Sequence, residues 1–278
     1  MMKETAGGSN SRMASTRPLI TLTTDFGTRD PYLGALRGAL LTACPGAQLV
    51  DIGHDLPPYD RLAGAYLLGA AAPWFPRGTV HLAVVDPGVG GPRRALAFSA
   101  GGSFFVGPDN GLFTAIYDRL ELAGMRAIDA PRLGLPEAHP TFHGRDLFAP
   151  VAGRLARGAP LEEIGPEVMD PVRLPLTAPR RDGQRLHAAV LAVDRFGNVA
   201  SNLTREALAR CGVREHELAL PGASRTLPVH RTFCDAPAGE VFLLWGSSGY
   251  LELALDQGSA AARLGLTAGE AIEFAVIG

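Results

Sequence analysis

The chain lacks the features that mark several common classes of protein. It has 278 residues and only three cysteines, Cys44, Cys211 and Cys234, which lie far apart. Their odd number and wide spacing fit neither a disulfide framework nor a metal site, so we expect a reducing cytoplasm as the compartment. The formal net charge is -2, without any block of like charges. Because nucleic acids and membrane surfaces are usually bound by a basic face, neither is an expected partner.

Long hydrophobic runs are also missing. No apolar stretch reaches the roughly 20 residues of a transmembrane helix. Residues 1–17 are rich in Ser, Gly and Met but hold no apolar segment, so we expect a disordered tail or a vector-derived leader instead of a signal peptide. Hydrophobic residues still make up 46% of the chain, which is enough for a sizeable core in one large or two ordinary domains.

Strands alternate with helices over residues 18–170. Apolar runs predict strands at 19–24, 48–52 and 80–85, and a hairpin of 95–99 and 104–106 around Ala100-Gly-Gly102. Helices are expected after Asp30 as N-cap with Pro31 as first residue, from Asp60 to about Ala71, at 112–122 and at 145–157. The alternation predicts an α/β domain whose mostly parallel sheet is flanked by helices.

The pattern changes after residue 170. Residues 171–186 contain prolines and arginines without a clear period and are expected to form a linker. Residues 187–278 then show strand after strand, which predicts a small all-β domain of the barrel or sandwich type. The expected strands are 187–193, 199–203, 217–220, 241–245, 250–255 and 271–277. One short helix, 259–264, is expected among them, with Ser259 as its cap and Gly265 as its stop.

Aspartates follow apolar strands at three places and are followed closely by glycine. Asp25 precedes Phe26-Gly27, Asp86 precedes Pro-Gly-Val-Gly, and Asp194 precedes Arg-Phe-Gly. Strand ends of this kind are where open α/β sheets bind their ligands. The glycines allow the backbone to approach a ligand closely. Asp86 is joined by arginines at positions 93 and 94, so we expect a charged site at its strand end.

Other candidates are weaker when taken singly. His143 stands before a predicted helix in His-Gly-Arg-Asp146 and, with an ordinary pKa near about 6.5, is suited to orient or deprotonate water. The Asp109-Asn110 pair is equally consistent with a β-turn and with a ligand contact. A metal held by His54, Asp25 and His143 is a minor alternative, because no metal-binding spacing supports it. The segment around Ser247-Ser248 lacks the order of a nucleophile elbow, but its small residues suit a carboxylate.

Taken together, seven motifs in a fixed order resemble those of the S-adenosylmethionine (SAM) hydroxide adenosyltransferases, relatives of the fluorinases and chlorinases. The resemblance covers about residues 18–278. Its motifs are Thr23-Thr-Asp-Phe-Gly27, Asp55-Leu-Pro-Pro-Tyr59, Val84-Val-Asp-Pro-Gly-Val-Gly90, Gly107-Pro-Asp-Asn-Gly111, Phe142-His-Gly-Arg-Asp146, Asp194-Arg-Phe-Gly-Asn198 and Ser247-Ser-Gly-Tyr-Leu251 running to Gln257-Gly-Ser259.

The resemblance implies an enzyme that hydrolyses SAM to adenosine and L-methionine without a metal or another cofactor. It further implies a C-terminal β barrel and a homotrimer with ligand sites between subunits. A triad that handles the water maps to Asp86, Arg93 and His143, with Arg94 as the alternative arginine.

The resemblance also assigns substrate contacts. Asp25 maps to the carboxylate that holds the ribose hydroxyls, and Tyr59 to an aromatic beside the ribose and methionine chain. Asp194 maps to the group that binds the methionine ammonium. In the same motif Asn198 maps to an adenine contact, and Phe196 is counted with the substrate-binding residues. Ser247 and Ser248 map to the segment that meets the methionine carboxylate.

The chain departs from the fluorinases at informative positions. It has Asp86 and Val89 where they have a tyrosine and a threonine near the halide, lacks their long insertion, and has Ser248 where they have an arginine. A SAM-dependent halogenase stays open as an alternative, although the Asp86 carboxylate would repel a halide. A module that binds SAM or adenosine without turnover is the second alternative, although such a module has no use for a water-activating triad.

Overall fold

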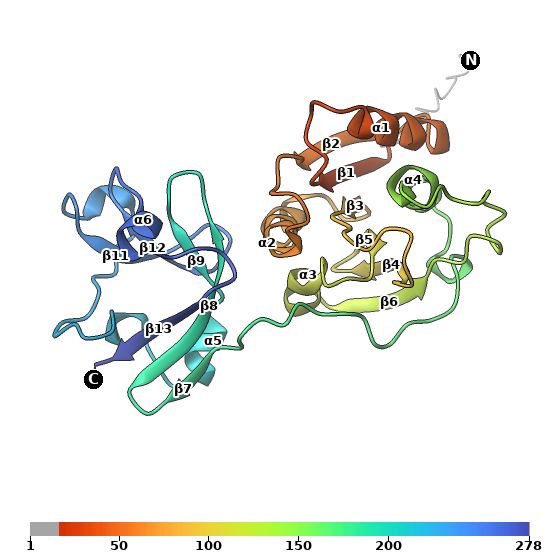
Figure 1. Cartoon of the computed structure of the whole chain (residues 1–278). Coiled ribbons are helices and arrows are strands. Elements are labelled where there is room, and N and C mark those ends of the chain that lie inside the picture. Colours follow the sequence, from red (N-terminus) through yellow and green to blue (C-terminus); the bar gives the residue numbers. More distant parts are fainter. Residues whose placement is uncertain (1–16, 278) are drawn as a thin grey trace, which may run out of the picture.

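A computed structural model describes residues 17–277, which form two sheets in two successive parts of the chain (Figure 1). The tail predicted at residues 1–17 lies, apart from Arg17, outside the described residues. The N-terminal sheet has the strand order β2-β1-β3-β5-β4-β6. Its strands are β1 (Leu19–Thr24), β2 (Gln48–Gly53), β3 (Val80–Val84), β4 (Ala95–Ala100), β5 (Ser103–Pro108) and β6 (Leu122–Ala127).

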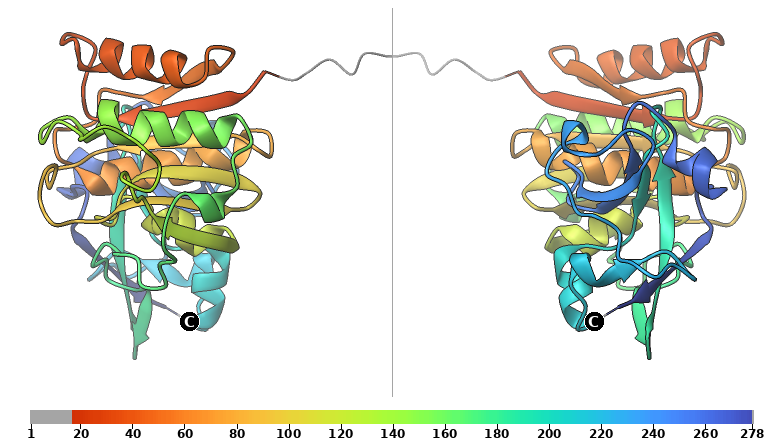
Figure 2. Two further views of the ribbon diagram at one scale, coloured as in Figure 1. Left: turned by 90° about the vertical axis from the view of Figure 1, so that its right-hand side faces the viewer. Right: turned by 90° about the vertical axis from the view of Figure 1, so that its left-hand side faces the viewer.

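The N-terminal sheet is mostly parallel and covered on both faces, as predicted. Strands β2, β1, β3 and β5 run parallel, and only β4 is antiparallel to its neighbours β5 and β6. Helices α1 (Tyr32–Ala43) and α4 (Ala149–Ala156) pack together on one face, and α2 (Arg61–Ala71) and α3 (Thr114–Arg119) on the other (Figures 1 and 2). Because both faces are covered, apolar side chains such as Ile20, Leu22 and Leu82 are fully buried.

The strand order places a topological switch between β1 and β3. From β1 the chain passes to β2 on one side and then returns to the other side of β1 to form β3. Connections that leave two adjacent parallel strands in opposite directions open a crevice at their carboxyl ends, where open α/β sheets bind ligands. Asp25 follows β1 and Asp86 lies just beyond β3, so both carboxylates flank this crevice.

The predicted helix ends are partly confirmed. Asp60 caps α2 by accepting from the Ala63 N–H at 2.9 Å. The prediction at Asp30 and Pro31 is wrong by one residue, since Pro31 occupies the cap and α1 begins at Tyr32 without a side-chain cap. The helix predicted at 145–157 is a π-helical turn, Gly144–Phe148, followed by α4. Pro150 has no N–H and blocks a regular helix across this point.

The structure departs further from the prediction in the segment 112–127, where a helix is shorter than expected and a strand was not expected. The helix expected at 112–122 is only α3, and Leu122 begins β6, which was not predicted. Strand β6 pairs antiparallel with β4, for example at Ala97 and Arg126. Pairing with this sheet edge overrides the local helical pattern, as tertiary context commonly does.

The C-terminal part forms an antiparallel sheet curled into a half-barrel, which confirms the predicted all-β character. Its order is β10-β13-β8-β9-β12-β11, and β7 pairs with β8. The strands are β7 (Arg180–Asp182), β8 (Arg185–Val193), β9 (Val199–Ser201), β10 (Leu218–Ala219), β11 (Val241–Trp245), β12 (Leu251–Leu255) and β13 (Ala271–Val276). Strand β7 falls within the stretch predicted as a linker, and β10 is shorter than the strand predicted at 217–220.

Two helices accompany the half-barrel. Helix α6 (Ala260–Leu264) has Ser259 as its cap and a left-handed Gly265 at its end, as predicted. Helix α5 (Arg205–Arg210) was not predicted, although Thr204 caps it in the usual way. Among residues 17–277, no helix combines the length and the apolar character that a membrane crossing requires.

Candidate active site

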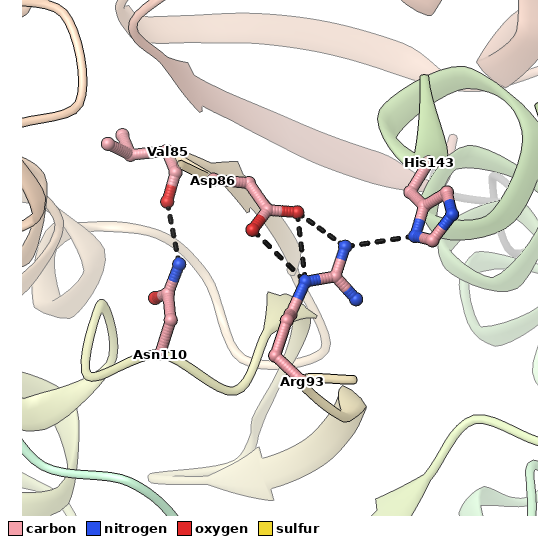
Figure 3. A network of polar contacts seen from close by, with 5 residues as sticks. All are labelled: Val85, Asp86, Arg93, Asn110 and His143. Carbon is pink, nitrogen blue, oxygen red and sulfur yellow. Dashed lines mark hydrogen bonds and ion pairs between the residues drawn. The ribbon is translucent and has the colours of Figure 1, made fainter. Parts of the chain in front are cut away.

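The predicted triad is assembled by a single arginine. Arg93 Nε lies 3.0 Å from each carboxylate oxygen of Asp86, and Arg93 Nη2 also binds Asp86 Oδ2 (Figure 3). The same Nη2 lies 2.9 Å from Nδ1 of His143. The guanidinium packs over the ring of Phe148, with 5.4 Å from its carbon to the ring centroid. Two segments that are about 50 residues apart in sequence, one with Asp86 and Arg93 and one with His143 and Phe148, therefore meet at Arg93.

The contact between Arg93 and His143 fixes the hydrogen on the imidazole. A guanidinium carries only donors, so Nδ1 of His143 must accept this hydrogen bond. A neutral imidazole that accepts at Nδ1 carries its hydrogen on Nε2. Burial, followed by the charge of Arg93, lowers the pKa of His143 below its usual value, against the raising effect of Asp86 and Asp146. Neutral His143 is therefore the prevailing form at neutral pH and offers an Nε2–H donor.

Arg94 has a different partner set from Arg93. Its Nε donates to Asp109 at 2.7 Å, and its Nη1 and Nη2 donate to the side chain and backbone oxygens of Asp170. Asp109 also accepts from the N–H of Val172. Arg94 thus fastens the start of the interdomain segment, and Arg93 is the arginine of the triad.

The Asp109-Asn110 turn has a structural role. The side-chain amide of Asn110 donates to the carbonyl of Val85 at 2.9 Å (Figure 3). The side-chain oxygen of Asn110 accepts from the N–H of Leu112. Val85 directly precedes Asp86. Asn110 therefore supports the backbone from which Asp86 projects, and the turn interpretation of this pair prevails over ligand contact.

Asp86 and His143 line a cavity of about 540 Å³, and Arg93 joins them from outside its lining. Its residues lie between Asp25 and Arg145, and they include Asp25, Tyr59, Asp86, Val89 and His143. Three rings that were not singled out from the sequence, those of Phe26, Tyr32 and Phe142, line it and meet edge to face at centroid distances of 5.6–6.2 Å. The cavity thus combines charged groups at its strand ends with an aromatic wall.

Asp25 and Tyr59 are linked at the rim of this cavity. The N–H of Tyr59 donates to Asp25 Oδ2 at 2.8 Å. Tyr59 has a φ of 68°, in the left-handed region, and its side chain is 70% exposed. Strained backbone at a non-glycine residue is concentrated at functional sites, so the geometry agrees with a ligand-facing Tyr59.

His54 belongs to the support of this site. Its Nδ1 lies 2.8 Å from the hydroxyl of Thr24, the residue before Asp25, and its Nε2 lies 3.0 Å from Asp51. Within the described range 17–277, no group of three or more His, Cys, Asp or Glu side chains is arranged to hold a metal ion. The structure therefore offers nothing in favour of the minor metal interpretation of His54, Asp25 and His143.

The remaining predicted contacts lie in the C-terminal domain. Asp194 accepts from the N–H groups of Phe196 and Asn198, both at 2.9 Å, and from the Asn198 amide at 2.8 Å. Phe196 is 77% exposed, whereas Asn198 is buried. Both line a second cavity of about 610 Å³ whose residues all lie between Phe196 and Ser259.

Phe233 is a candidate that the sequence analysis missed. It lines the second cavity together with Phe196 and is 42% exposed. It sits in a short 3-10 turn, Phe233–Asp235, held by a capping box between Thr232 and Asp235. Its ring meets that of the buried Phe242 edge to face, with centroids 6.3 Å apart, and stays partly exposed. A large aromatic in such a polar turn was the available signal.

Ser247 and Ser248 differ in accessibility. Ser247 is exposed at the tip of the turn between β11 and β12, and the side chain of Ser248 is buried. The carbonyl of Ser248 accepts a hydrogen bond from Arg119 at 2.6 Å. Of the two predicted serines, only Ser247 presents its hydroxyl to solvent.

Comparison with known families identifies the chain. The model of the SAM hydroxide adenosyltransferase N-terminal domain matches residues 20–165, and that of the C-terminal domain matches residues 188–273. The chain belongs to the SAM hydroxide adenosyltransferase family. The resemblance based on the seven motifs is thereby confirmed.

Individual relatives of this adenosyltransferase-family protein are similar to it over nearly its whole length. An (R)-S-adenosyl-L-methionine hydrolase of Thermus thermophilus is 43% identical over 91% of this chain and 97% of its own length. A fluorinase of an Actinoplanes species is only 27% identical, over 92% of this chain and 97% of its own length. The crystal structure of an uncharacterized conserved protein from Thermotoga maritima matches with a TM-score of 0.82 and 31% identity, over 92% of this chain and 99% of that one.

Glu252 of this adenosyltransferase-family protein has a raised carboxyl pKa. Burial, reinforced by the charge of Asp194, raises the pKa of Glu252 to about 7. Its carboxylate lies against Gly246 of the β11–β12 turn. Its negative charge, after burial, contributes to the raised pKa of Tyr66. Since the pKa in the unfolded chain is 4.5, the folded state binds a proton that the unfolded state releases between these two values.

Substituting Glu252 with Gln should therefore stabilise the protein in a pH-dependent way. Stability conferred by a raised carboxyl pKa is lost as the pH rises from the unfolded to the folded pKa. We expect E252Q to raise the melting temperature more at about pH 8, where wild-type Glu252 is ionised, than at about pH 5. Thermal unfolding of both proteins at the two pH values checks this, and an equal shift at both would contradict the assignment.

Proposed function

We propose that this protein hydrolyses SAM to adenosine and L-methionine and that its substrate is the R epimer at sulfur. The observation that carries the proposal is that Arg93 bridges Asp86 and His143, two residues that line one cavity together with Asp25. The epimer comes from the name of the Thermus hydrolase, with which the chain shares 43% identity. The hydrolysis predicted from the sequence agrees with that name.

Hydrolysis of SAM requires activation of the attacking water but no general acid for the leaving group. Attack of water oxygen on the ribose C5′ breaks the C5′–sulfur bond, and the bonding pair leaves with sulfur as the neutral thioether of methionine. The leaving group therefore needs no proton. Water must lose one proton, and its pKa in bulk is about 15.7. These steps call for a proton acceptor and a positioned water, and they need no metal ion or redox cofactor.

In our proposal the triad divides these tasks. Asp86 accepts the proton from water at Oδ1, because this oxygen receives one hydrogen bond from Arg93 and keeps a second lone pair free, whereas Oδ2 receives two. His143 donates from Nε2 to the water oxygen and stabilises the developing hydroxide. Arg93 holds both groups and keeps His143 neutral. General acid–base help of this type is worth roughly 10²–10⁴-fold in rate, and alignment of water with the breaking bond adds a proximity effect.

Substrate contacts are proposed for both cavities. Asp25 receives the ribose hydroxyls beside the Tyr59 ring. Phe196 and Phe233 offer two exposed rings for the adenine, with Asn198 near its edge. Asp194 attracts the methionine ammonium, and Ser247 with the turn around Ser248 receives the carboxylate. Asp25 and Tyr59 line the first cavity, and both rings line the second together with Asn198. The support for Asp194 is its hydrogen bonds to Phe196 and Asn198, and that for Ser247 is its exposure.

The two alternatives are less well supported. A halogenase would have to hold a halide beside Asp86, whose side chain is only 4% exposed, and like charges in such a place repel strongly. A binding module without turnover leaves the Arg93 bridge without a purpose. The cytoplasm remains our proposed compartment, in keeping with three free cysteines.

The direct test supplies SAM as separated sulfur epimers. We expect adenosine and L-methionine in equal amounts, faster from the R epimer than from the S epimer, because the protein resembles hydrolases of that name. Chromatography without halide, and again with chloride or fluoride, measures the products. Halogenated adenosine in excess of adenosine would favour the halogenase, and bound SAM without any product would favour the binding module.

The role of His143 predicts a specific pH dependence. Protonation of His143 at Nδ1 breaks its bond to Arg93, so kcat/KM should fall on the acid side with an apparent pKa below the usual 6.5. His143→Gln should lose at least about 10²-fold in kcat/KM and lack this acid limb. Profiles between about pH 5 and 9 check this. An unchanged acid limb in H143Q would assign that limb to another group.

We further propose a homotrimer with active sites between subunits. In one chain, the first cavity is lined only by residues 25–145 and the second only by residues 196–259. A ligand with its ribose in one and its base in the other requires both cavities to face each other. Unlike surfaces that meet head to tail generate closed rings when the rotation closes, and a trimer is such a ring.

Complementation tests this arrangement. Asp86→Asn disables the first cavity and Asp194→Asn the second, so each variant alone should have little activity. When the two are co-expressed in equal amounts, sites formed between subunits combine two intact halves in about one quarter of cases. We expect recovery toward that fraction, measured as adenosine formed by purified mixed oligomers. No recovery in verified mixed oligomers would place each site within one chain.

A further inference from the structure

The turn between β11 and β12 presents unpaired backbone donors. Gly246 donates to Tyr250 and Gly249 donates to Gly246, both at 2.9 Å, which closes the turn. Within the described part of the chain, the N–H groups of Ser247 and Ser248 have no such partner. Successive free N–H groups form a concave site for anions. With the exposed Ser247 hydroxyl, the tip of the turn is suited to a carboxylate.

The orientation of this turn depends on the N-terminal domain of the same chain. Arg119 is the last residue of α3, and its Nη2 donates to the Ser248 carbonyl at 2.6 Å. Its guanidinium carbon lies 5.1 Å from the ring centroid of Tyr250. The ring of Tyr66, from α2, also packs against the ring of Tyr250, with centroids 6.1 Å apart. The turn is therefore fastened at its backbone and at the buried ring that follows it.

We infer that Arg119 is a positioning residue for carboxylate recognition by the turn at residues 246–249. Fixing the Ser248 carbonyl fixes the plane of the next peptide and, through the short turn, the direction of the Ser247 and Ser248 N–H groups. Arg119 does not need to touch the ligand for this. The inference rests on the proposed function, in which this turn receives the methionine carboxylate.

The geometry distinguishes this role from general docking of the domains. Arg119 and Arg173 both line a cavity of about 1040 Å³ between the two domains. Arg173, however, pairs with Asp118 and packs over Tyr117, both of the N-terminal domain. Arg119 instead reaches a backbone atom of the other domain. Arg173 is therefore the matched control, because it has the same charge and lines the same cavity without touching the turn.

The experiment compares Arg119→Met, Arg119→Lys and Arg173→Met. Calorimetry measures the Kd of L-methionine in the presence of adenosine, and separately the Kd of adenosine. We expect R119M to weaken methionine binding about tenfold, as loss of a charged hydrogen bond does, with adenosine binding unchanged. R119K should recover part of the loss, R173M should behave as wild type, and in turnover R119M should raise KM for SAM more than it lowers kcat.

Each result decides the question. Unchanged methionine binding in R119M, or equal weakening of methionine and adenosine, would overturn the inference, because the first denies any effect and the second shows only a general disturbance. Melting temperature and oligomer mass verify that each variant is folded. If wild-type protein binds methionine but forms no adenosine, the proposed hydrolysis fails, while the effect of Arg119 on methionine binding can still be measured. If Ser247→Ala and R119M both leave methionine binding unchanged, the turn is not the carboxylate site and the inference falls with it.

Discussion

The site depends on one guanidinium that binds two different partners at once. Arg93 neutralises Asp86, which is almost fully buried, and gives a hydrogen bond to His143. A buried carboxylate without its cation typically costs about 3–5 kcal/mol, so the pairing with Arg93 is what makes the burial of the Asp86 side chain tolerable. The same cation disfavours protonation of His143. One side chain therefore connects the two groups to which we assign the handling of water.

Topology determines where this guanidinium can act. Strand β2 lies on one side of β1 and β3 on the other, so the connections at the carboxyl ends of β1 and β3 lead in opposite directions and leave a crevice between them. Asp25 and Asp86 stand at its two sides, and His143 enters from the segment before α4. This much was predictable, since apolar strands that end in Asp and Gly show both the strand and its exit. The parallel sheet, the β hairpin at 95–106 and the caps at Asp60 and Ser259 followed from similarly local signals.

Features that arise from pairing over long distances were not predictable. Strand β6 exists because β4 has a free edge, and no local pattern at Leu122 shows this. The hydrogen on His143 is placed by Arg93, 50 residues earlier in the chain. Phe233 becomes a candidate only when folding brings it beside Phe196. The seven motifs identified the family, but roles that depend on which atom meets which required coordinates.

Arg93 and Arg94 also show how narrowly the loop before them is constrained. Arg94 already continues the ladder into β4, since its carbonyl accepts from the N–H of Asp109, and successive side chains on an extended segment point to opposite sides. One arginine therefore binds Asp86 and His143, while its neighbour fastens the segment that leads to the other domain. A change of one residue in the length of loop 87–92 would exchange these two positions. The length of this loop therefore determines which arginine meets Asp86 and which holds the interdomain segment, and Gly90 within it has a φ of 76° and no room for a Cβ beside the Pro140 carbonyl.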